Sequence, residues 1–123
     1  MLIDTNLIIY AVHPNNPHLR RWLVGQKPGC SVISRVEALG YHRLSEAGHQ
    51  SIEAVLNHMD IFYPTVETFE KAIRLRQQRK ISLGDALIAA TALEQRQTLA
   101  TANADDFLWI TDLTVINPLK MSA

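Results

Sequence analysis

Five short apolar runs alternate with longer segments of helical periodicity, and this alternation limits what the chain can fold into. Each run is too short and too continuously apolar for a half-exposed strand, so we expect buried strands. Buried strands that alternate with helices predict a parallel sheet covered by helices on both faces. We therefore expect a three-layer α/β/α fold with a parallel sheet of four to five strands. The runs are Met1–Ile3, Cys30–Ile33, Ile61–Tyr63, Leu99–Ala100 and Leu113–Ile116.

The segments between the runs carry helix signals. Pro17 follows Asn16, which suits a helix with Asn16 as N-cap and Pro17 in its first turn. The segment Ser82–Gln95 is apolar almost all round, so we expect that helix to be buried. The other expected helices are Thr5–Val12, Arg35–Glu46, Ser51–Met59, Thr65–Lys80 and the short Asn103–Leu108.

Composition narrows the class of protein. The 123 residues are 47% hydrophobic, which suits a single domain over 1–123 with an ordinary core. No apolar stretch reaches the roughly 18 residues of a membrane span, and Met1 leads directly into a strand without a signal segment. Cys30 is the only cysteine, which excludes an internal disulfide and favours a cytoplasmic location.

The net charge of zero argues against a generic basic nucleic-acid binder. It does not argue against a nuclease, because acids gathered in one site can offset basic residues on its rim.

Four junctions that lead into helices carry an oxygen-rich side chain. Asp4 ends the first strand, Glu37 follows the second, Asp85 opens the buried helix and Asn103 follows the fourth strand. In open α/β sheets, ligands bind outside the carboxyl ends of the strands. We therefore expect these side chains to share one crevice.

Helix capping is the alternative explanation for each junction taken alone. Asp4 suits an N-cap, and the other pairs suit capping boxes or caps: Ser34 with Glu37, Ser82 with Asp85, and Asn103 with Asp106. Capping, however, predicts Ser, Thr and Asn as readily as acids. Three converging carboxylates would raise one another's pKa values, and a hard divalent cation such as Mg²⁺ or Mn²⁺ would relieve that conflict. Such an ion can activate water and neutralise charge on a phosphodiester.

The motifs themselves resemble a known family. The successive motifs are Met1-Leu2-Ile3-Asp4-Thr5-Asn6, Val36-Glu37, Ile81-Ser82-Leu83-Gly84-Asp85-Ala86-Leu87-Ile88-Ala89-Ala90-Thr91-Ala92 and Thr101-Ala102-Asn103-Ala104-Asp105-Asp106-Phe107. They look like those of the PIN-domain family, from Met1 to about Pro118. In length and order the chain is similar to the VapC-type toxins of prokaryotic toxin–antitoxin pairs. The resemblance implies a parallel sheet between helices and an endoribonuclease that depends on Mg²⁺ or Mn²⁺.

The resemblance also implies roles for particular residues. Asp4, Glu37 and Asp85 would be the acidic triad that holds the metal. The family often has a fourth acid two residues after the threonine, where this chain has Asn103, a weaker and neutral ligand. Asp105 or Asp106 is an alternative there, although Asp106 is expected mainly to cap its helix. The residues expected to support the ligands or to hold water are Thr5, Asn6, Thr101 and Asp106.

RNA and protein partners follow from the same resemblance. Arg35, Arg79 and Lys80 are candidates for phosphate contacts, and solvated surface charges are the alternative interpretation. The family suggests a homodimer and a cognate VapB-like antitoxin. Because Val36–Met59 has more apolar residues than a small core needs, we expect part of it to bind one of these partners.

Other functions stay open. A PIN nuclease could act on DNA or in RNA processing without being a toxin. The neutral Asn103 keeps a non-catalytic RNA-binding module among the hypotheses. A receiver-like signalling domain needs an acceptor Asp after the third strand, and Ile61-Phe62-Tyr63-Pro64-Thr65 has none.

Overall fold

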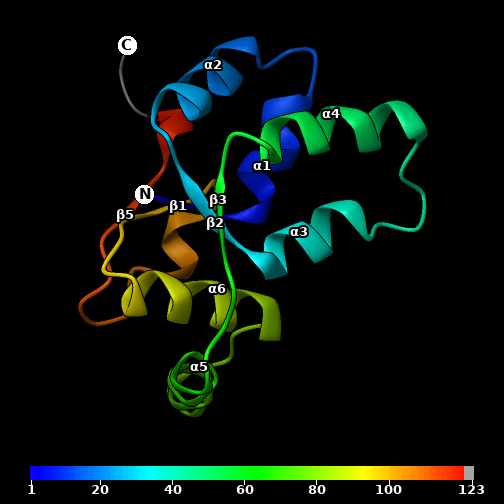
Figure 1. Cartoon of the computed structure of the whole chain (residues 1–123). Coiled ribbons are helices and arrows are strands. Elements are labelled where there is room, and N and C mark those ends of the chain that lie inside the picture. The colour runs from blue at the N-terminus through cyan, green and yellow to red at the C-terminus, as the bar shows by residue number, and fades with distance from the viewer. Residues whose placement is uncertain (121–123) are drawn as a thin grey trace.

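The computed structural model describes residues 1–120, which form a parallel sheet and the helices around it (Figure 1). The single domain expected over 1–123 includes residues 121–123, which lie outside the described residues. The elements are β1 (Leu2–Ile3), α1 (Thr5–Val12), α2 (Pro17–Gly25), β2 (Gly29–Ser31), α3 (Val32–Leu39), α4 (Glu46–Leu56), β3 (Asp60–Phe62), α5 (Val66–Gln78), α6 (Leu83–Glu94), β4 (Leu99–Ala100), the 3₁₀ turn η1 (Ala104–Asp106), β5 (Val115–Ile116) and the 3₁₀ turn η2 (Pro118–Lys120).

The first strand is the centre of the sheet. All pairs are parallel in the order β3-β2-β1-β4-β5, with Leu2 opposite both Gly29 and Leu99. The chain moves outward from β1 to β3 and then returns to β4, on the other side of β1. Strand order therefore reverses between β1 and β4, and this switch point is where open α/β sheets bind ligands. The predicted five-stranded parallel sheet between helices is confirmed.

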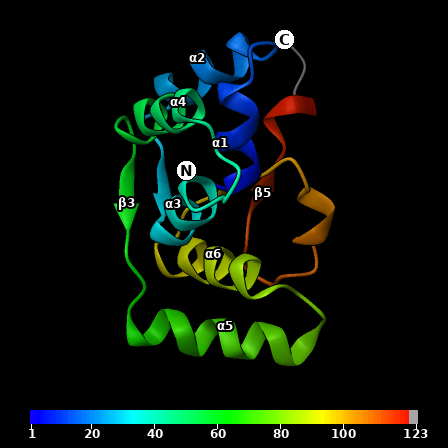
Figure 2. The same ribbon diagram turned by 90° about the vertical axis from the view of Figure 1, so that its right-hand side faces the viewer.

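The two residues of β1 serve two separate cores, because successive strand side chains point to opposite faces. Ile3 joins the core formed with residues of α1, α2 and α4, whereas Leu2 joins the core formed with α5 and α6. Figure 2 shows these helix groups on opposite sides of the sheet, with α6 between the sheet and α5. Both residues are fully buried, so each contributes the roughly 1.5–3 kcal/mol typical of an apolar side chain.

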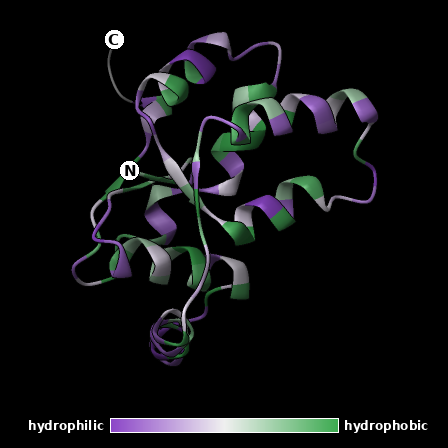
Figure 3. Ribbon diagram, in the orientation of Figure 1, coloured by the Kyte–Doolittle hydropathy of each residue, from purple (hydrophilic) through white to green (hydrophobic). Residues whose placement is uncertain are grey.

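Helix α6 is the buried helix that its sequence predicts. Every residue from Ala86 to Ala92 is buried, and the Thr91 hydroxyl donates to the Leu87 carbonyl at 2.7 Å. Figure 3 shows the contrast with α5, whose ribbon is largely hydrophilic. Helix α5 covers α6, and its Ala72 and Leu75 belong to the same core as the buried residues of α6.

The helix expected at Arg35–Glu46 is placed differently. It begins at Val32 because the Ser31 hydroxyl caps it, accepting from the Ile33 amide at 3.0 Å. It ends at Leu39. The β-branched Val32 and Ile33 favoured a strand in the sequence, but the cap starts the helix immediately after Ser31. The predicted cap at Ser34 is wrong for this reason. Val36 of this helix is 64% exposed.

The next helix also starts earlier than expected. Helix α4 begins at Glu46 instead of Ser51, since the Ser45 hydroxyl accepts from the Gly48 amide at 3.0 Å. Other boundaries lie within a few residues of their predicted positions, and α1 and β4 match theirs. The region Val36–Met59 is therefore two helices joined by the turn around Tyr41, not one long helix followed by a short one.

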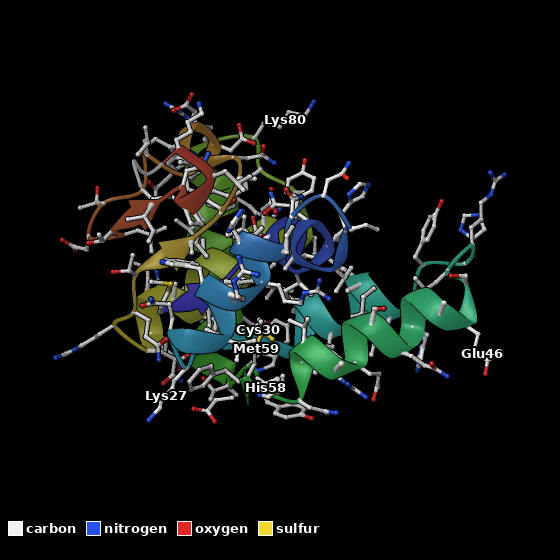
Figure 4. The ribbon with its side chains drawn as sticks, turned by 90° about the horizontal axis from the view of Figure 1, so that it is seen from above. Lys27, Cys30, Glu46, His58, Met59 and Lys80 are labelled. Atoms are coloured by element: carbon white, nitrogen blue, oxygen red, sulfur yellow. The ribbon has the colours of Figure 1, made fainter. Side chains whose placement is uncertain are left out.

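Cys30 lies inside the core formed with α1, α2 and α4. Figure 4 labels it beside Met59, and both side chains belong to that core. Burial raises the pKa of the Cys30 thiol to about 12, so the thiol stays protonated and unreactive at neutral pH. None of the helices within residues 1–120 has both the length and the apolar character needed to span a membrane.

Candidate active site

Asp4 lies at the switch point, directly after the central strand. Its carboxylate caps α1, because Oδ1 accepts from the Thr5 amide at 2.8 Å. Oδ2 accepts from the Thr101 hydroxyl at 2.8 Å, and Thr101 follows β4. The Asp4–Thr101 bond therefore spans the switch point between β1 and β4. Asp4 is only 4% exposed. It caps α1 and also lies at the switch point, so the helix-cap interpretation and the interpretation as a residue of the ligand crevice are compatible.

The Thr101 hydroxyl is held in turn by its surroundings. It accepts from the Asn6 side-chain amide at 3.4 Å and from the Asn103 backbone amide at 3.0 Å. The side-chain Oδ1 of Asn6 accepts from the Ala102 backbone amide at 3.3 Å. With its acceptor sites occupied, the Thr101 hydroxyl has its proton directed at Asp4, which fixes the orientation of that carboxylate.

Glu37 lies in the second turn of α3 and not at its start. The predicted capping box of Ser34 with Glu37 is therefore wrong. Glu37 Oε1 instead lies 2.7 Å from Thr5 Oγ1, which is also 2.9 Å from Ser34 Oγ. An ionised carboxylate can only accept, so the single Thr5 proton goes to Glu37. The residue after Asp4 thus holds the second acid.

Asp85 opens α6, and Ser82 caps that helix as predicted. The Ser82 hydroxyl accepts from the Asp85 amide at 3.1 Å. The neighbouring Gly84 explains how Glu37 comes so close, since a Cβ at Gly84 would lie 2.7 Å from Glu37 Oε2. The absence of a side chain at Gly84 lets the Glu37 carboxylate pack against the backbone of the residue that precedes Asp85.

The electrostatics of the three acids agree with this geometry. Burial, with a smaller effect of the charges of Asp85 and Glu37, raises the pKa of Asp4 to about 6 against the lowering effect of the Thr101 and Thr5 hydrogen bonds. Partial burial is also the main reason that the pKa of Asp85 is raised, with Glu37 and Asp106 adding to it. Within residues 1–120, no Lys, Arg or His forms an ion pair with Asp4, Glu37 or Asp85.

A surface depression of about 400 Å³ lies beside Asp85. Two exposed cations border it, and the Lys80 side chain extends outward in Figure 4, away from Lys27 and His58 at the opposite side. Its lining residues are Arg79, Lys80, Ile81, Ser82, Asp85, Asp105, Asp106 and Trp109.

A larger cavity, of about 600 Å³, lies next to Thr98 and Thr114, which precede β4 and β5. It is therefore at the opposite, amino edge of the sheet. Asp112 is its single lining carboxylate, so we assign the chemistry to the smaller depression.

Of the remaining predicted residues, Asp106 and Asn103 lie near the depression beside Asp85, and Arg35 does not line it. Asp106 is exposed but close enough to Asp85 to affect its pKa. Asn103 precedes η1 without a side-chain capping bond, so its predicted capping role is wrong. It lines a neighbouring depression of about 360 Å³ with Asp105 and Asp106. Arg35 pairs with Glu53 of α4 at 3.3 Å and does not line the depression that contains Asp85.

Trp109 is a site residue that the sequence did not reveal. Its indole Nε1 donates to the Asp106 carbonyl at 2.8 Å, and the Arg79 guanidinium carbon lies 5.1 Å from the ring centroid. Trp109 lies in an irregular segment, so no helical or strand periodicity indicated which way its ring would point. Its proximity to Arg79 depends on the end of α5 meeting the segment after η1.

Comparison with known proteins decides the family. The family model described as the PIN domain matches residues 1–110. The chain belongs to the PIN domain family. The resemblance that its motifs carry is thereby confirmed. A comparison with curated proteins finds no match.

Solved structures share the fold of this PIN domain over nearly its whole length. A toxin–antitoxin complex from Klebsiella pneumoniae is 27% identical with a TM-score of 0.77, covering 98% of each chain. VapBC2 from Rickettsia felis, bound to a promoter DNA fragment, is 21% identical with a TM-score of 0.79, covering 94% of this chain and 96% of that one. FitAcB from Neisseria gonorrhoeae is 24% identical with a TM-score of 0.78, covering 98% and 99%.

The donors in this PIN domain fit a hard divalent cation. All three acids offer oxygen, and the buried Asp4 carboxylate has no cationic partner within residues 1–120. No three His, Cys, Asp or Glu side chains in this part of the chain already surround a common point. Mg²⁺ keeps several of its waters, so it can bind such a site through one or two carboxylates directly. Glu37 is exposed, so its carboxylate would be accessible to such an ion.

Proposed function

We propose that this chain is a metal-dependent endoribonuclease, the toxin of a type II toxin–antitoxin system, acting in the cytoplasm as a single nuclease domain over 1–123. One observation carries the proposal. Asp4 is a buried carboxylate at the switch point of a parallel sheet, with Glu37 and Asp85 beside it and no cationic partner among residues 1–120. Burying an unpaired carboxylate is costly, so the fold is expected to retain it for chemistry.

In this proposal Asp4, Glu37 and Asp85 hold Mg²⁺ or Mn²⁺, with Asn103 as a weak additional ligand from the neighbouring depression. The ion, when bound, lowers the pKa of water and neutralises charge on the phosphodiester. Thr101 and Thr5 orient the Asp4 and Glu37 carboxylates through bonds of 2.8 and 2.7 Å. Fixed ligand orientation matters because hydrogen bonds to ligands typically change metal affinity or activity 10–100-fold.

The cations beside Asp85 are the proposed contacts to RNA. Arg79 and Lys80 are exposed and line the same depression as Asp85. Contacts to the RNA backbone at this rim would position a phosphodiester without reading its sequence. Arg35 is a weaker candidate for such a contact, since its guanidinium is paired with Glu53.

Hydrolysis of RNA by the purified protein tests the proposal. A labelled single-stranded RNA is expected to be cleaved internally with Mg²⁺ or Mn²⁺, and EDTA should abolish the cleavage. A DNA oligonucleotide of the same sequence is the matched substrate control. Cleavage of RNA that continues in EDTA would contradict the metal dependence, and cleavage of DNA alone would favour the alternative of a nuclease in DNA metabolism.

A cognate VapB-like antitoxin and a second copy of the chain are the proposed protein partners. Support comes from the 27% identity, over 98% of both chains, to a structure described as a toxin–antitoxin complex. The region Val36–Met59 offers exposed apolar residues, with Val36 64% and Tyr41 53% exposed. Sedimentation of the protein, alone and with the product of the adjacent small gene, tests this. A monomer that forms no complex and does not arrest growth on expression would contradict the toxin assignment.

A further inference from the structure

The Arg79 guanidinium lies over the ring of Trp109 in the lining of the depression beside Asp85, and we call this pair the Arg79–Trp109 stack. The Arg79 guanidinium carbon lies 5.1 Å from the centroid of the Trp109 ring. The bond from the indole Nε1 to the Asp106 carbonyl fixes the orientation of the ring. Part of Trp109 packs against the core formed with α5 and α6, which anchors it from below. The stack is therefore held in place before any ligand arrives.

Core packing alone does not account for the position of Arg79. Three carboxylates line the same depression, from Asp85, Asp105 and Asp106. Arg79 nevertheless forms no ion pair with an acid anywhere in residues 1–120, and it lies over the indole instead. An exposed guanidinium placed on an aromatic ring keeps its other planar face available for a further flat group.

The charge of the depression indicates which flat group fits. Before a metal ion binds, its lining has two cations, Arg79 and Lys80, against the three carboxylates, so a phosphate deep inside it would be repelled. An uncharged nucleobase avoids that repulsion and stacks on aromatic rings and guanidinium planes. Carboxylates such as Asp105 and Asp106 can accept from a base amino group.

We propose that the Arg79–Trp109 stack is a platform for one unpaired nucleobase of the RNA, beside the site of cleavage. This rests on the proposed nuclease function and deepens it, because only single-stranded RNA can offer a splayed base. Arg79 then contacts a base, and Lys80 is left as the phosphate contact at the rim.

Tryptophan fluorescence tests the platform directly. The chain has two tryptophans, and Trp22 lies on α2 against the other core, so Trp22→Phe leaves Trp109 as the only reporter. In EDTA, where no hydrolysis is expected, a short single-stranded RNA should quench Trp109. An abasic oligonucleotide with the same backbone, and a blunt duplex of the same sequence, should quench it little.

Variants at the platform separate stacking from packing. Trp109→Leu keeps an apolar side chain on the core and should weaken single-stranded RNA binding between about fivefold and a hundredfold. Binding of the abasic oligonucleotide should not change. Trp109→Phe keeps an aromatic face and should retain most of the affinity. Arg79→Lys keeps the charge but loses the plane, and so gives the same test without removing a core contact.

Equal binding of RNA and the abasic oligonucleotide by the wild type would overturn the platform, and so would unchanged RNA affinity in a folded Trp109→Leu or Arg79→Lys variant. Cleavage with Mn²⁺, measured separately, distinguishes the two proposals. A protein that cleaves RNA but shows no base-dependent quenching lacks only the platform. Base-dependent quenching without cleavage refutes only the nuclease.

Discussion

Asp4→Asn is expected to reduce the rate of RNA hydrolysis about a hundredfold or more. Loss of a residue that hydrogen-bonds a metal ligand typically costs about 10–100-fold, and loss of the charge of a ligand itself should cost at least as much. The substitution keeps the shape of the side chain. The Asn carbonyl can still accept from the Thr5 amide, but its NH₂ group then faces the Thr101 hydroxyl, whose two acceptor sites are taken by Asn6 and Asn103. The charge and one hydrogen bond are lost, which is a small change beside the stability of a whole domain, so the loss of rate should come without loss of the fold. Initial rates at saturating Mn²⁺ measure it.

Two further variants provide an intermediate effect and a control for the same rate measurement. Gly84→Ala places a Cβ only 2.7 Å from Glu37 Oε2 and should displace that carboxylate, with about a tenfold loss of rate. Asp112→Asn is the matched control, because Asp112 lies at the opposite edge and its φ of 68° suits Asn. It should leave the rate unchanged. Full activity in Asp4→Asn would refute the assignment of the site.

The stability of the metal-free protein is expected to fall as the pH rises from about 4 to about 6. The pKa of Asp4 is raised by burial from 3.8 to about 6, so the folded state binds a proton that the unfolded chain has already lost. Unfolding therefore becomes easier across this window, and the contribution of Asp4 is fully present only below it. At pH 7 the cost is about 3 kcal/mol of unfolding free energy. Asp85, whose pKa is also raised, changes stability in the same direction.

Denaturant unfolding at several pH values, with wild type and Asp4→Asn side by side, isolates this effect from other carboxylates. Asp4→Asn should be the more stable protein at pH 7, and the difference should vanish near pH 4. Saturating Mn²⁺ should stabilise the wild type at pH 7 and the variant much less, since an ion that binds only the folded state shifts the equilibrium toward it. A difference that does not depend on pH would contradict the pKa of Asp4.

Much of the fold follows from local patterns in the sequence. The continuous apolar runs predicted buried parallel strands, because a strand that is apolar on both faces must be covered on both faces. The apolar character of Ser82–Gln95 predicted the buried α6, because a helix that is apolar all round must be shielded from water on all sides. Asp4 and Thr101 could be placed at one edge because each follows a strand and the carboxyl ends of parallel strands meet there, whereas Asp85 follows helix α5 and reaches this edge at the start of α6. Their convergence is a matter of topology, which alternating strands and helices largely determine. That they bind metal stays a prediction.

The rest depended on contacts between distant segments. The start of α3 was ambiguous because Val32 and Ile33 suit a strand as well as a helix, and the Ser31 cap decides between them. Glu37 was placed in a capping box by its spacing from Ser34, whereas its actual partner is Thr5. Trp109 gave no signal because its ring meets Arg79 only through the packing of separate loops.

The bond between Asp4 and Thr101 joins residues 97 positions apart. During synthesis from the N-terminus, Asp4 is made almost first, yet its orienting hydroxyl and the acid at Asp85 are made late. The ribosome must therefore produce most of the domain before the carboxylates can assemble. For the proposed ribonuclease this order of synthesis has a consequence: the nascent chain is expected to spare the RNA that surrounds it, because its site is incomplete until folding is nearly complete.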